Sequence, residues 1–176
     1  FAGSIQEYVI EIADPSRYRP DHCPQCQAAH ELTAHGFYRR KLVDQAFDGS
    51  IRVRRYLCRS CKRTVSLLPQ FALPYLRFGI PVIALFMIAR LLSGDTLSAA
   101  AAAALSDMPY QRGQFWVRRF RSQAERLCAV LAALLAPGHP LGPAPNFVSR
   151  AVLMLQAIGW IGAHRFLFAD LRVHLL

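Results

Sequence analysis

The chain has 176 residues, 53% of them hydrophobic, and a formal net charge of +10 at neutral pH. That length allows one sizeable core or two small ones, and the hydrophobic share argues against extensive disorder. No run reaches the roughly 18 uninterrupted apolar residues of a spanning helix, and no basic stretch precedes an apolar one near the N-terminus. We therefore expect neither a membrane span nor a signal peptide.

After a predicted N-terminal extension, residues 1–20, two cysteine pairs share one spacing. Two residues separate Cys23 from Cys26, and after 31 intervening residues Cys58 and Cys61 repeat that gap. A two-residue gap lets both sulfurs of a pair face one ion, and two pairs complete a tetrahedral shell of four thiolates. The spacing predicts one structural Zn²⁺ ion with no coordination position left for substrate.

Other interpretations of the four cysteines remain open at this point. Two disulfides, a redox-active pair and an iron–sulfur cluster use the same residue type. The fifth cysteine, Cys128, lies in a helical pattern and is expected to be a small buried side chain. The nearby histidines, His22, His30 and His35, are expected to be surface groups or groups close to the ligands.

A β-hairpin is predicted between the two cysteine pairs. The segment GFYRRKLVD, 36–44, has strand character, Asp48-Gly49 is a turn signal, and IRVRRYLC, 51–58, returns to the second pair. KRTVSLLP, 62–69, predicts a third strand. Together these segments predict a zinc-ribbon domain over residues 21–70.

The positive charge is concentrated in two windows. Residues 36–63 contain nine Lys or Arg against two Asp, and residues 110–126 contain five Arg against one Glu. Charge focused in this way is typical of a protein that binds a polyanion, because each neutralised phosphate releases condensed counterions. The alternative is that these residues only keep the protein in solution.

Residues 71–136 predict a helical domain. A helix is expected from about Ile80 to Leu92, then an Ala-rich helix capped by Asp95 or Thr96. After a turn at SDMP, 106–109, a longer helix opens at Tyr110 and ends near Pro137. A short helix, a turn and a basic helix form a helix-turn-helix pattern, although a plain helical hairpin has the same appearance.

Helical spacing divides the side chains of that longer helix. The residues expected to face the core are Phe115, Trp116, Val117, Phe120, Leu127 and Val130 or Leu131. The residues expected to face outward and contact nucleic acid are Gln111, Arg112, Gln114, Arg118 and Arg119. Gln and Arg make bidentate contacts with adenine and guanine edges, so this face is predicted to read bases.

The remainder of the chain is a predicted Pro/Gly linker, residues 137–150, and an apolar helical segment, residues 151–176. We expect that segment to break near Gly159 or Gly162 and to pack on the body or on a second copy. The predicted fold class is therefore α+β: a small N-terminal β zinc ribbon followed by an all-α helix-turn-helix bundle.

Four stretches carry a family resemblance: HCPQC, HGFYRRK, RVRRYLCRSCKRTVSLLP and FALPYLRFG. They resemble a family of bacterial zinc-ribbon proteins linked to transposable elements, itself a domain-of-unknown-function family, closely over residues 20–80 and loosely over 81–135. A ribbon followed by a helix-turn-helix is also similar to the small DNA-binding subunits of insertion sequences. The resemblance implies that the four cysteines bind the metal, and that the protein is cytoplasmic, nucleoid-associated and tied to mobile elements. Lys62 departs from the pattern, since many ribbons have Gly after the second pair, which bears on the turn conformation.

The predicted function is therefore that of a DNA-binding protein of a mobile element, acting in transposition or its transcriptional control. The residues predicted to hold phosphates are Arg39, Arg40, Lys41, Arg52, Arg54 and Arg55. The expected partners are duplex DNA, proteins of a transposition complex and a second copy of the chain. The alternative is a ribbon adaptor that binds a partner protein or RNA.

Catalysis is not expected. A nuclease or transposase centre needs convergent carboxylates around a metal pair. The available candidates are Asp44, Asp48, Asp95, Asp107, Glu125 and Asp170. Two fall on the predicted hairpin and two at predicted helix caps, and the chain beyond the helices is too short for a separate nuclease fold.

Overall fold

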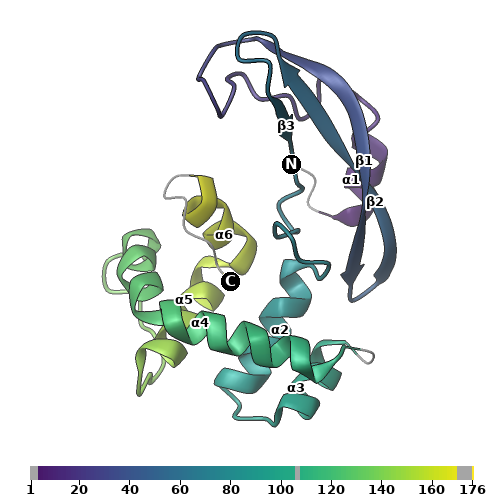
Figure 1. Ribbon diagram of the computed structural model, residues 1–176. Coiled ribbons are helices and arrows are strands. Elements are labelled where there is room, and N and C mark those ends of the chain that lie inside the picture. The colour runs from purple at the N-terminus through teal and green to yellow at the C-terminus, as the bar shows by residue number, and fades with distance from the viewer. Residues whose placement is uncertain (1–3, 106–107, 170–175) are drawn as a thin grey trace. The chain divides into compact units, whose positions relative to one another are not determined.

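The computed structural model describes residues 4–105, 108–169 and 176. The chain divides into two compact units, Phe1–Gly79 and Ile80–Leu176. The described residues contain six α-helices, one short 3₁₀-helix and one antiparallel three-stranded sheet, which confirms the α+β class (Figure 1). The predicted boundary after residue 70 falls inside the first unit, because backbone hydrogen bonds tie Arg77 and Gly79 to Val43.

The first unit is built on a long hairpin of β1 (Leu32–Asp44) and β2 (Phe47–Cys58), with β3 (Thr64–Ser66) beside β2. Both predicted strands are longer than expected, and the predicted third strand forms over three residues. The predicted turn at Asp48-Gly49 is wrong. Asp44 pairs with Phe47, so the turn consists of residues 45–46, and Asp48 and Gly49 lie within β2.

The cysteines explain why this register prevails over the local turn signal. In the observed register Leu32 lies opposite Cys58, which brings the second cysteine pair to the strand end that leads back to the first. A turn at Asp48-Gly49 would instead place Cys58 near Arg39, about 20 Å along the strand at roughly 3.3 Å per residue. The four sulfurs would then not meet.

The N-terminal residues form part of this unit, where the sequence predicted only an extension. Helix α1 (Ile5–Glu11) begins at Ser4, whose hydroxyl accepts from the Glu7 N–H while the Glu7 carboxylate accepts from the Ser4 N–H. Tyr8 on α1 is buried, and its hydroxyl donates to the main-chain oxygen of Arg52 at 2.8 Å. The helix is thereby fixed to β2.

The second unit is helical. Its elements are α2 (Ile80–Leu91), α3 (Leu97–Ala104), α4 (Tyr110–Leu131), the 3₁₀-helix η1 (Ala132–Leu134), α5 (Phe147–Ile158) and α6 (Trp160–Ala169). Thr96 is the N-cap of α3, as predicted, with its hydroxyl accepting from the Ala99 N–H. The predicted turn between α3 and α4 includes Ser106 and Asp107, which lie outside the described residues.

The core of the helical unit depends on a close approach of α4 to α2. The rings of Phe86 and Trp116 pack edge to face at 5.6 Å, and both side chains are fully buried. A Cβ added to Gly113 would lie 2.2 Å from the Phe86 ring. Only a glycine therefore allows α4 to lie against that ring.

The apolar C-terminal segment packs within its own unit. Ala151, Val152 and Leu155 of α5 are fully buried, and Asn146 caps the helix, so the predicted linker ends earlier than residue 150. Gly159, with φ of +90°, separates α5 from α6, which confirms the predicted break. Among the described residues, no single helix is long and apolar enough to cross a membrane, although α5 and α6 together reach that length and composition around a bend of 103°.

Candidate metal centre and basic surfaces

The first cysteine pair lies on a tight backbone knuckle. The Cys23 N–H donates to the Ala28 oxygen at 3.0 Å, and the Gln27 N–H donates back to the Cys23 oxygen at 2.8 Å. Gln27 has φ of +62°, in the left-handed region that non-glycine residues rarely adopt. This conformation turns the chain sharply after Cys26.

The second pair repeats that knuckle. The Cys58 N–H donates to the Arg63 oxygen at 2.9 Å, and the Lys62 N–H donates to the Cys58 oxygen at 3.0 Å. Lys62 has φ of +59°, so it adopts the conformation for which many ribbons use glycine. The departure at Lys62 therefore leaves the turn unchanged and costs about 1 kcal/mol of backbone strain.

The two knuckles bring the four sulfurs together. Cys23 Sγ lies 3.9 Å from Cys61 Sγ, Cys26 Sγ lies 3.7 Å from Cys58 Sγ, and all four lie within 4.8 Å of one another. Among the described residues they are the one group of three or more His, Cys, Asp or Glu side chains that could hold a metal ion. The four cysteines thus lie close enough to bind one ion.

The sulfur spacing fits a tetrahedral thiolate cage. Zn–S bonds of about 2.3 Å in tetrahedral geometry put the sulfurs about 3.8 Å apart, which matches the two shorter separations of 3.9 and 3.7 Å. All five cysteines are free thiols, so the structure does not contain the two disulfides of the alternative interpretation. The cage has room for a single ion but not for a cluster with its own bridging sulfides.

The backbone around the thiols favours a thiolate at Cys23. Desolvation raises its pKa, but N–H groups of Cys26 and Gln25 and the thiols of Cys58 and Cys26 outweigh this effect and bring the pKa to about 7. The Cys61 thiol receives a backbone hydrogen bond from Arg63, yet desolvation and the neighbouring sulfurs raise its pKa to about 11. A cation at the centre would remove that mutual repulsion.

The apolar cluster around the sulfurs is small. It consists of Leu32, Tyr56 and Val65 with the side chains of Cys23 and Cys58. The three nearby histidines are exposed, in agreement with their predicted role as surface groups. Cys128 is buried in α4 of the other unit and is not a member of the cysteine group.

The outer face of the hairpin carries unpaired positive charge. Arg39 lies directly opposite Arg52, so the two side chains share one face. Both are exposed, and neither forms an ion pair with another described residue. Lys41 lies on the same face, paired with Asp48 at 3.4 Å.

Two of the predicted phosphate contacts are structural. Arg54 is 6% exposed, and its guanidinium donates to the main-chain oxygens of Ile12 and Ala13 at 2.8 Å each. Arg40 is partly buried and donates to the main-chain oxygens of Leu73 and Leu76. We therefore remove Arg54 and Arg40 from the set of candidate contacts.

Arg55 has an intermediate position. It is partly buried on β2 opposite Ser66 of β3. It stays in the candidate set with Arg39, Lys41 and Arg52.

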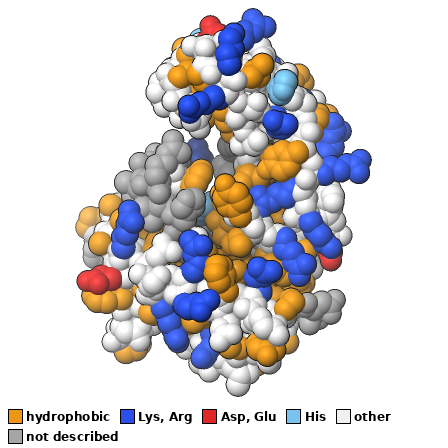
Figure 2. Space-filling model, viewed as in Figure 1, with side chains coloured by type: hydrophobic (Ala, Val, Ile, Leu, Met, Phe, Trp, Pro, Cys, Tyr) orange, Lys and Arg blue, Asp and Glu red, His pale blue; other side chains and the backbone are white. Residues whose placement is uncertain are grey.

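Helix α4 presents the second basic surface. Its five exposed arginines are Arg112, Arg118, Arg119, Arg121 and Arg126, and Gln111 and Gln114 are exposed beside them. Figure 2 shows Lys and Arg side chains gathered where Figure 1 draws α4. All five residues predicted to read bases therefore face outward.

The apolar face of α4 follows the predicted pattern with one exception. Trp116, Phe120 and Leu127 are fully buried. Phe115 is 37% exposed, contrary to prediction, and its ring lies 5.7 Å from the guanidinium carbon of Arg119. Five positions away from Phe120, it falls on the opposite side of the helix, at 100° per residue.

Among the described residues, the candidate carboxylates do not belong to any group of three or more side chains that could hold a metal ion. Asp48 pairs with Lys41, and Asp44 is half-buried, with its pKa raised by desolvation. Asp95 and Glu125 lie in the other unit. Asp107 and Asp170 lie outside the described residues.

The sequence did not predict the pocket that the structure shows beside α4. Arg90 of α2 and Arg121 of α4 line it, although they are 31 residues apart. Their proximity depends on the packing of Gly113 against Phe86, which no local pattern reveals.

One family comparison matches part of the chain. Residues 23–106 match DUF6431, a domain of unknown function. The match begins at the first cysteine, includes the whole ribbon, α2 and α3, and ends before α4. Neither curated proteins nor solved structures give a match to this chain.

Proposed function

We propose that the chain is a DNA-binding protein in which one structural Zn²⁺ ion holds a basic hairpin. In this proposal the outer face of the hairpin contacts phosphates and α4 enters the major groove. The thiolate set and its spacing favour zinc because four sulfurs in a tetrahedral cage are its usual structural ligands.

The observation that carries this proposal is the exposed face of α4. Five arginines lie along it against Glu125, and none forms an ion pair with another described residue. Like charges at such density repel one another and weaken the helix. A phosphate backbone would relieve this repulsion and release its own counterions at the same time.

The hairpin supports the same function. Like charges directly opposite each other across two strands are destabilising, yet Arg39 and Arg52 occupy such positions. A phosphate between the two guanidinium groups would turn this repulsion into attraction. Arg39, Lys41, Arg52 and Arg55 are therefore proposed to position the duplex without reading its sequence.

Helix α4 is proposed to read bases as the second helix of a helix-turn-helix, with α3 as the first. Gln111, Arg112, Gln114, Arg118 and Arg119 lie near its N-terminal end, the part of a recognition helix that contacts base edges. Arg suits guanine and Gln suits adenine, each through two hydrogen bonds.

Salt-dependent binding to duplex DNA tests this proposal. Fluorescence anisotropy with zinc-loaded protein and a random 30-base-pair duplex should give a log–log salt slope of about −5 or steeper, as expected for six or more phosphate contacts. Affinity that hardly changes between low and moderate salt would contradict it. Selection from random duplexes, with Arg112→Ala as the control variant, should yield a preferred sequence that the variant loses.

The same measurements distinguish the alternative function, a ribbon adaptor, from DNA binding. Affinity for duplex no higher than for heparin, single-stranded DNA or RNA would favour a ribbon adaptor that binds RNA or a partner protein. The protein is proposed to be non-catalytic, so incubation with Mg²⁺ should leave the duplex uncut. Its association with a mobile element and its nucleoid location rest on the family resemblance alone.

A further inference from the structure

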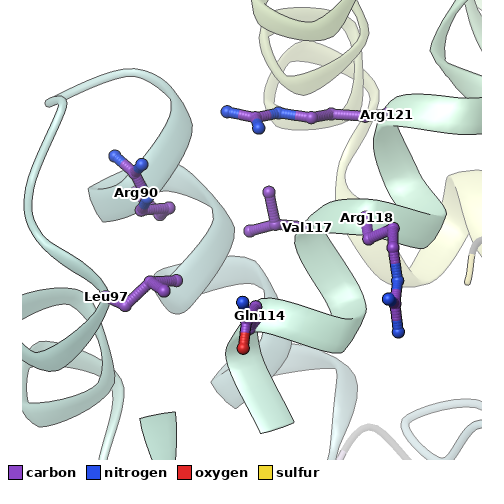
Figure 3. Close-up of a pocket in the computed structure, with 6 residues that line it drawn as sticks. All are labelled: Arg90, Leu97, Gln114, Val117, Arg118 and Arg121. Carbon is purple, nitrogen blue, oxygen red and sulfur yellow. The ribbon is translucent and has the colours of Figure 1, made fainter. Parts of the chain in front are cut away.

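A pocket of about 380 Å³ lies within the helical unit, on one flank of α4 (Figure 3). Its lining residues are Arg90 of α2, Leu97 of α3, and Gln114, Val117, Arg118 and Arg121 of α4. Three of the six are arginines, and none is acidic. Every charged side chain around the pocket is therefore positive, although most of the surface that lines the pocket is apolar.

Two arginines on different helices line the pocket. Arg121 extends from α4 toward the side on which Arg90 stands, whereas the guanidinium of Arg118 points away from Arg90 (Figure 3). Arg90 and Arg121 thus form the two sides of the site, and Arg118 forms its rim. Gln114 adds an amide that can donate a hydrogen bond.

Arg90 is held in place without being neutralised. Its Nη1 donates to the main-chain oxygen of Asp95 at 2.9 Å, which orients the guanidinium but leaves its charge. Its Nε is buried and has no hydrogen-bond partner among the described residues. A buried donor without a partner destabilises the protein, so the strained environment of Arg90 adds to the excess of positive charge beside the pocket.

We propose that this pocket binds a phosphodiester group of the nucleic-acid backbone, held between Arg90 and Arg121 with Gln114 as a further donor. The inference rests on the proposed function and adds a site to it, since neither Arg90 nor Arg121 belongs to the predicted contacts. The arginine forks match the oxygens of a phosphate in geometry and charge.

The remaining lining favours a nucleotide unit over a bare ion. Leu97 and Val117 supply an apolar wall, which suits a sugar ring attached to the phosphate. The pocket is also larger than a phosphate ion needs. Inorganic phosphate is therefore expected to bind more weakly than a dinucleotide, which carries both the phosphodiester and its sugars.

The DNA test uses full-length zinc-loaded protein with Arg90→Gln, Arg121→Gln and the double variant. The double variant should lose affinity for the random duplex by roughly tenfold or more at 0.1 M salt and flatten the salt slope by about 1. The matched control is Arg150→Gln, an exposed arginine of α5 in the same unit that lies outside both α4 and the pocket. It should change affinity less than about threefold, because its charge acts only through screened attraction.

One result of this comparison would overturn the proposed site. If the double variant binds as Arg150→Gln does, the pocket is not a backbone site, although the protein still binds DNA. Thermal melting monitors the folding of each variant. If Arg90→Gln unfolds the helical unit, the comparison is made with Arg121→Gln alone, because that side chain is exposed.

A second measurement keeps the pocket testable if the wild type binds no duplex and the proposed function fails. Titration of ¹⁵N-labelled protein with a thymidine dinucleotide, and separately with inorganic phosphate, should shift the Nε–H signals of Arg90 and Arg121 in a saturable way. Shifts with the dinucleotide at lower concentration than with phosphate support the phosphodiester site. Equal, non-saturating shifts across all arginines, or no shifts, overturn it.

Discussion

The two units of the chain reach a defined fold by different means. In the first, the apolar cluster beside the cysteines includes only three residues besides two of the ligands themselves. In the second, fully buried aromatic and aliphatic side chains from α2, α4 and α5 pack together. The cysteine end of the first unit, with this small cluster, needs a crosslink or a metal. The helical core does not, and neither does the rest of the hairpin unit, where Leu42, Ile51 and Val53 are also buried.

The difference extends to the role of arginine. In the first unit two arginines donate to main-chain oxygens and hold loops to the hairpin, while others on the same strands stay exposed. On α4 all five arginines are exposed. Composition alone therefore overstates the basic surface of the ribbon and describes that of α4 well.

Metal removal should produce the largest difference in stability between the two units. Structural zinc contributes about 10–16 kcal/mol in zinc-finger peptides, as much as the whole stability of a typical domain. With Cys58→Ser, or with chelator, we expect residues 21–31 and 58–67 to lose hydrogen-exchange protection while α2 and α4 keep theirs. Hydrogen exchange followed by mass spectrometry, together with zinc release after thiol modification, measures both.

Cys128→Ala is the matched control for this experiment, since Cys128 is a buried thiol of the helical unit. It should leave one zinc per chain and the knuckle protection unchanged. A wild-type protein that holds no stoichiometric zinc, or knuckles that stay protected in chelator, would contradict a metal-held ribbon.

Gly113→Ala should destabilise the helical unit and spare the ribbon. An alanine in an exposed helix position is worth about 1 kcal/mol over glycine, but here its Cβ would lie 2.2 Å from Phe86. Overpacking of a core costs about 1–3 kcal/mol, so the sign of the change reverses. Urea unfolding followed by circular dichroism at 222 nm measures it.

Gly162→Ala, also within a helix, is expected to stabilise the helical unit, in contrast to Gly113→Ala. No atom lies within 4 Å of the Cβ it would add on α6, so the variant should gain up to about 1 kcal/mol. Equal stabilisation by both substitutions would show that α4 does not approach α2 as closely as the structure places it.

The sequence predicts the metal ligands more accurately than it predicts the register of the hairpin. Two cysteines with two residues between them indicate a local knuckle, and this spacing is enough to predict which residues are the ligands. The Asp48-Gly49 signal is equally local, but strand register depends on pairing between Leu32 and Cys58, which are 26 residues apart. Tertiary pairing prevailed over turn propensity.

The arginines show a similar limit of prediction from the sequence. Arg52 and Arg54 lie on the same strand face two residues apart, and the guanidinium carbon of each lies 3.8 Å from the Phe37 ring centre. One is exposed and the other is buried because only Arg54 reaches the chain at Ile12 and Ala13. No pattern in the strand itself distinguishes them, since the deciding partner comes from the N-terminal segment.

Arg54→Gln should therefore act on stability. It removes two charge-assisted hydrogen bonds to the main-chain oxygens of Ile12 and Ala13, and bonds to charged groups contribute about 1.5–3 kcal/mol. We expect a loss of about 2 kcal/mol in the first unit, measured as a lower urea midpoint of residue-resolved signals from β1 and β2. At salt and temperature where the variant is folded, its DNA salt slope should equal that of the wild type.

Arg39→Gln is the counterpart, with the smallest effect on stability and the opposite sign. It removes one member of the opposed pair Arg39–Arg52, and like charges at such positions cost about 0.2–1 kcal/mol. The variant should unfold at slightly higher urea concentration and yet bind duplex with a salt slope about 1 less steep. A gain in stability with unchanged DNA binding would remove the hairpin face from the interface, whereas a loss of both would mean that Arg39, like Arg54, serves the fold.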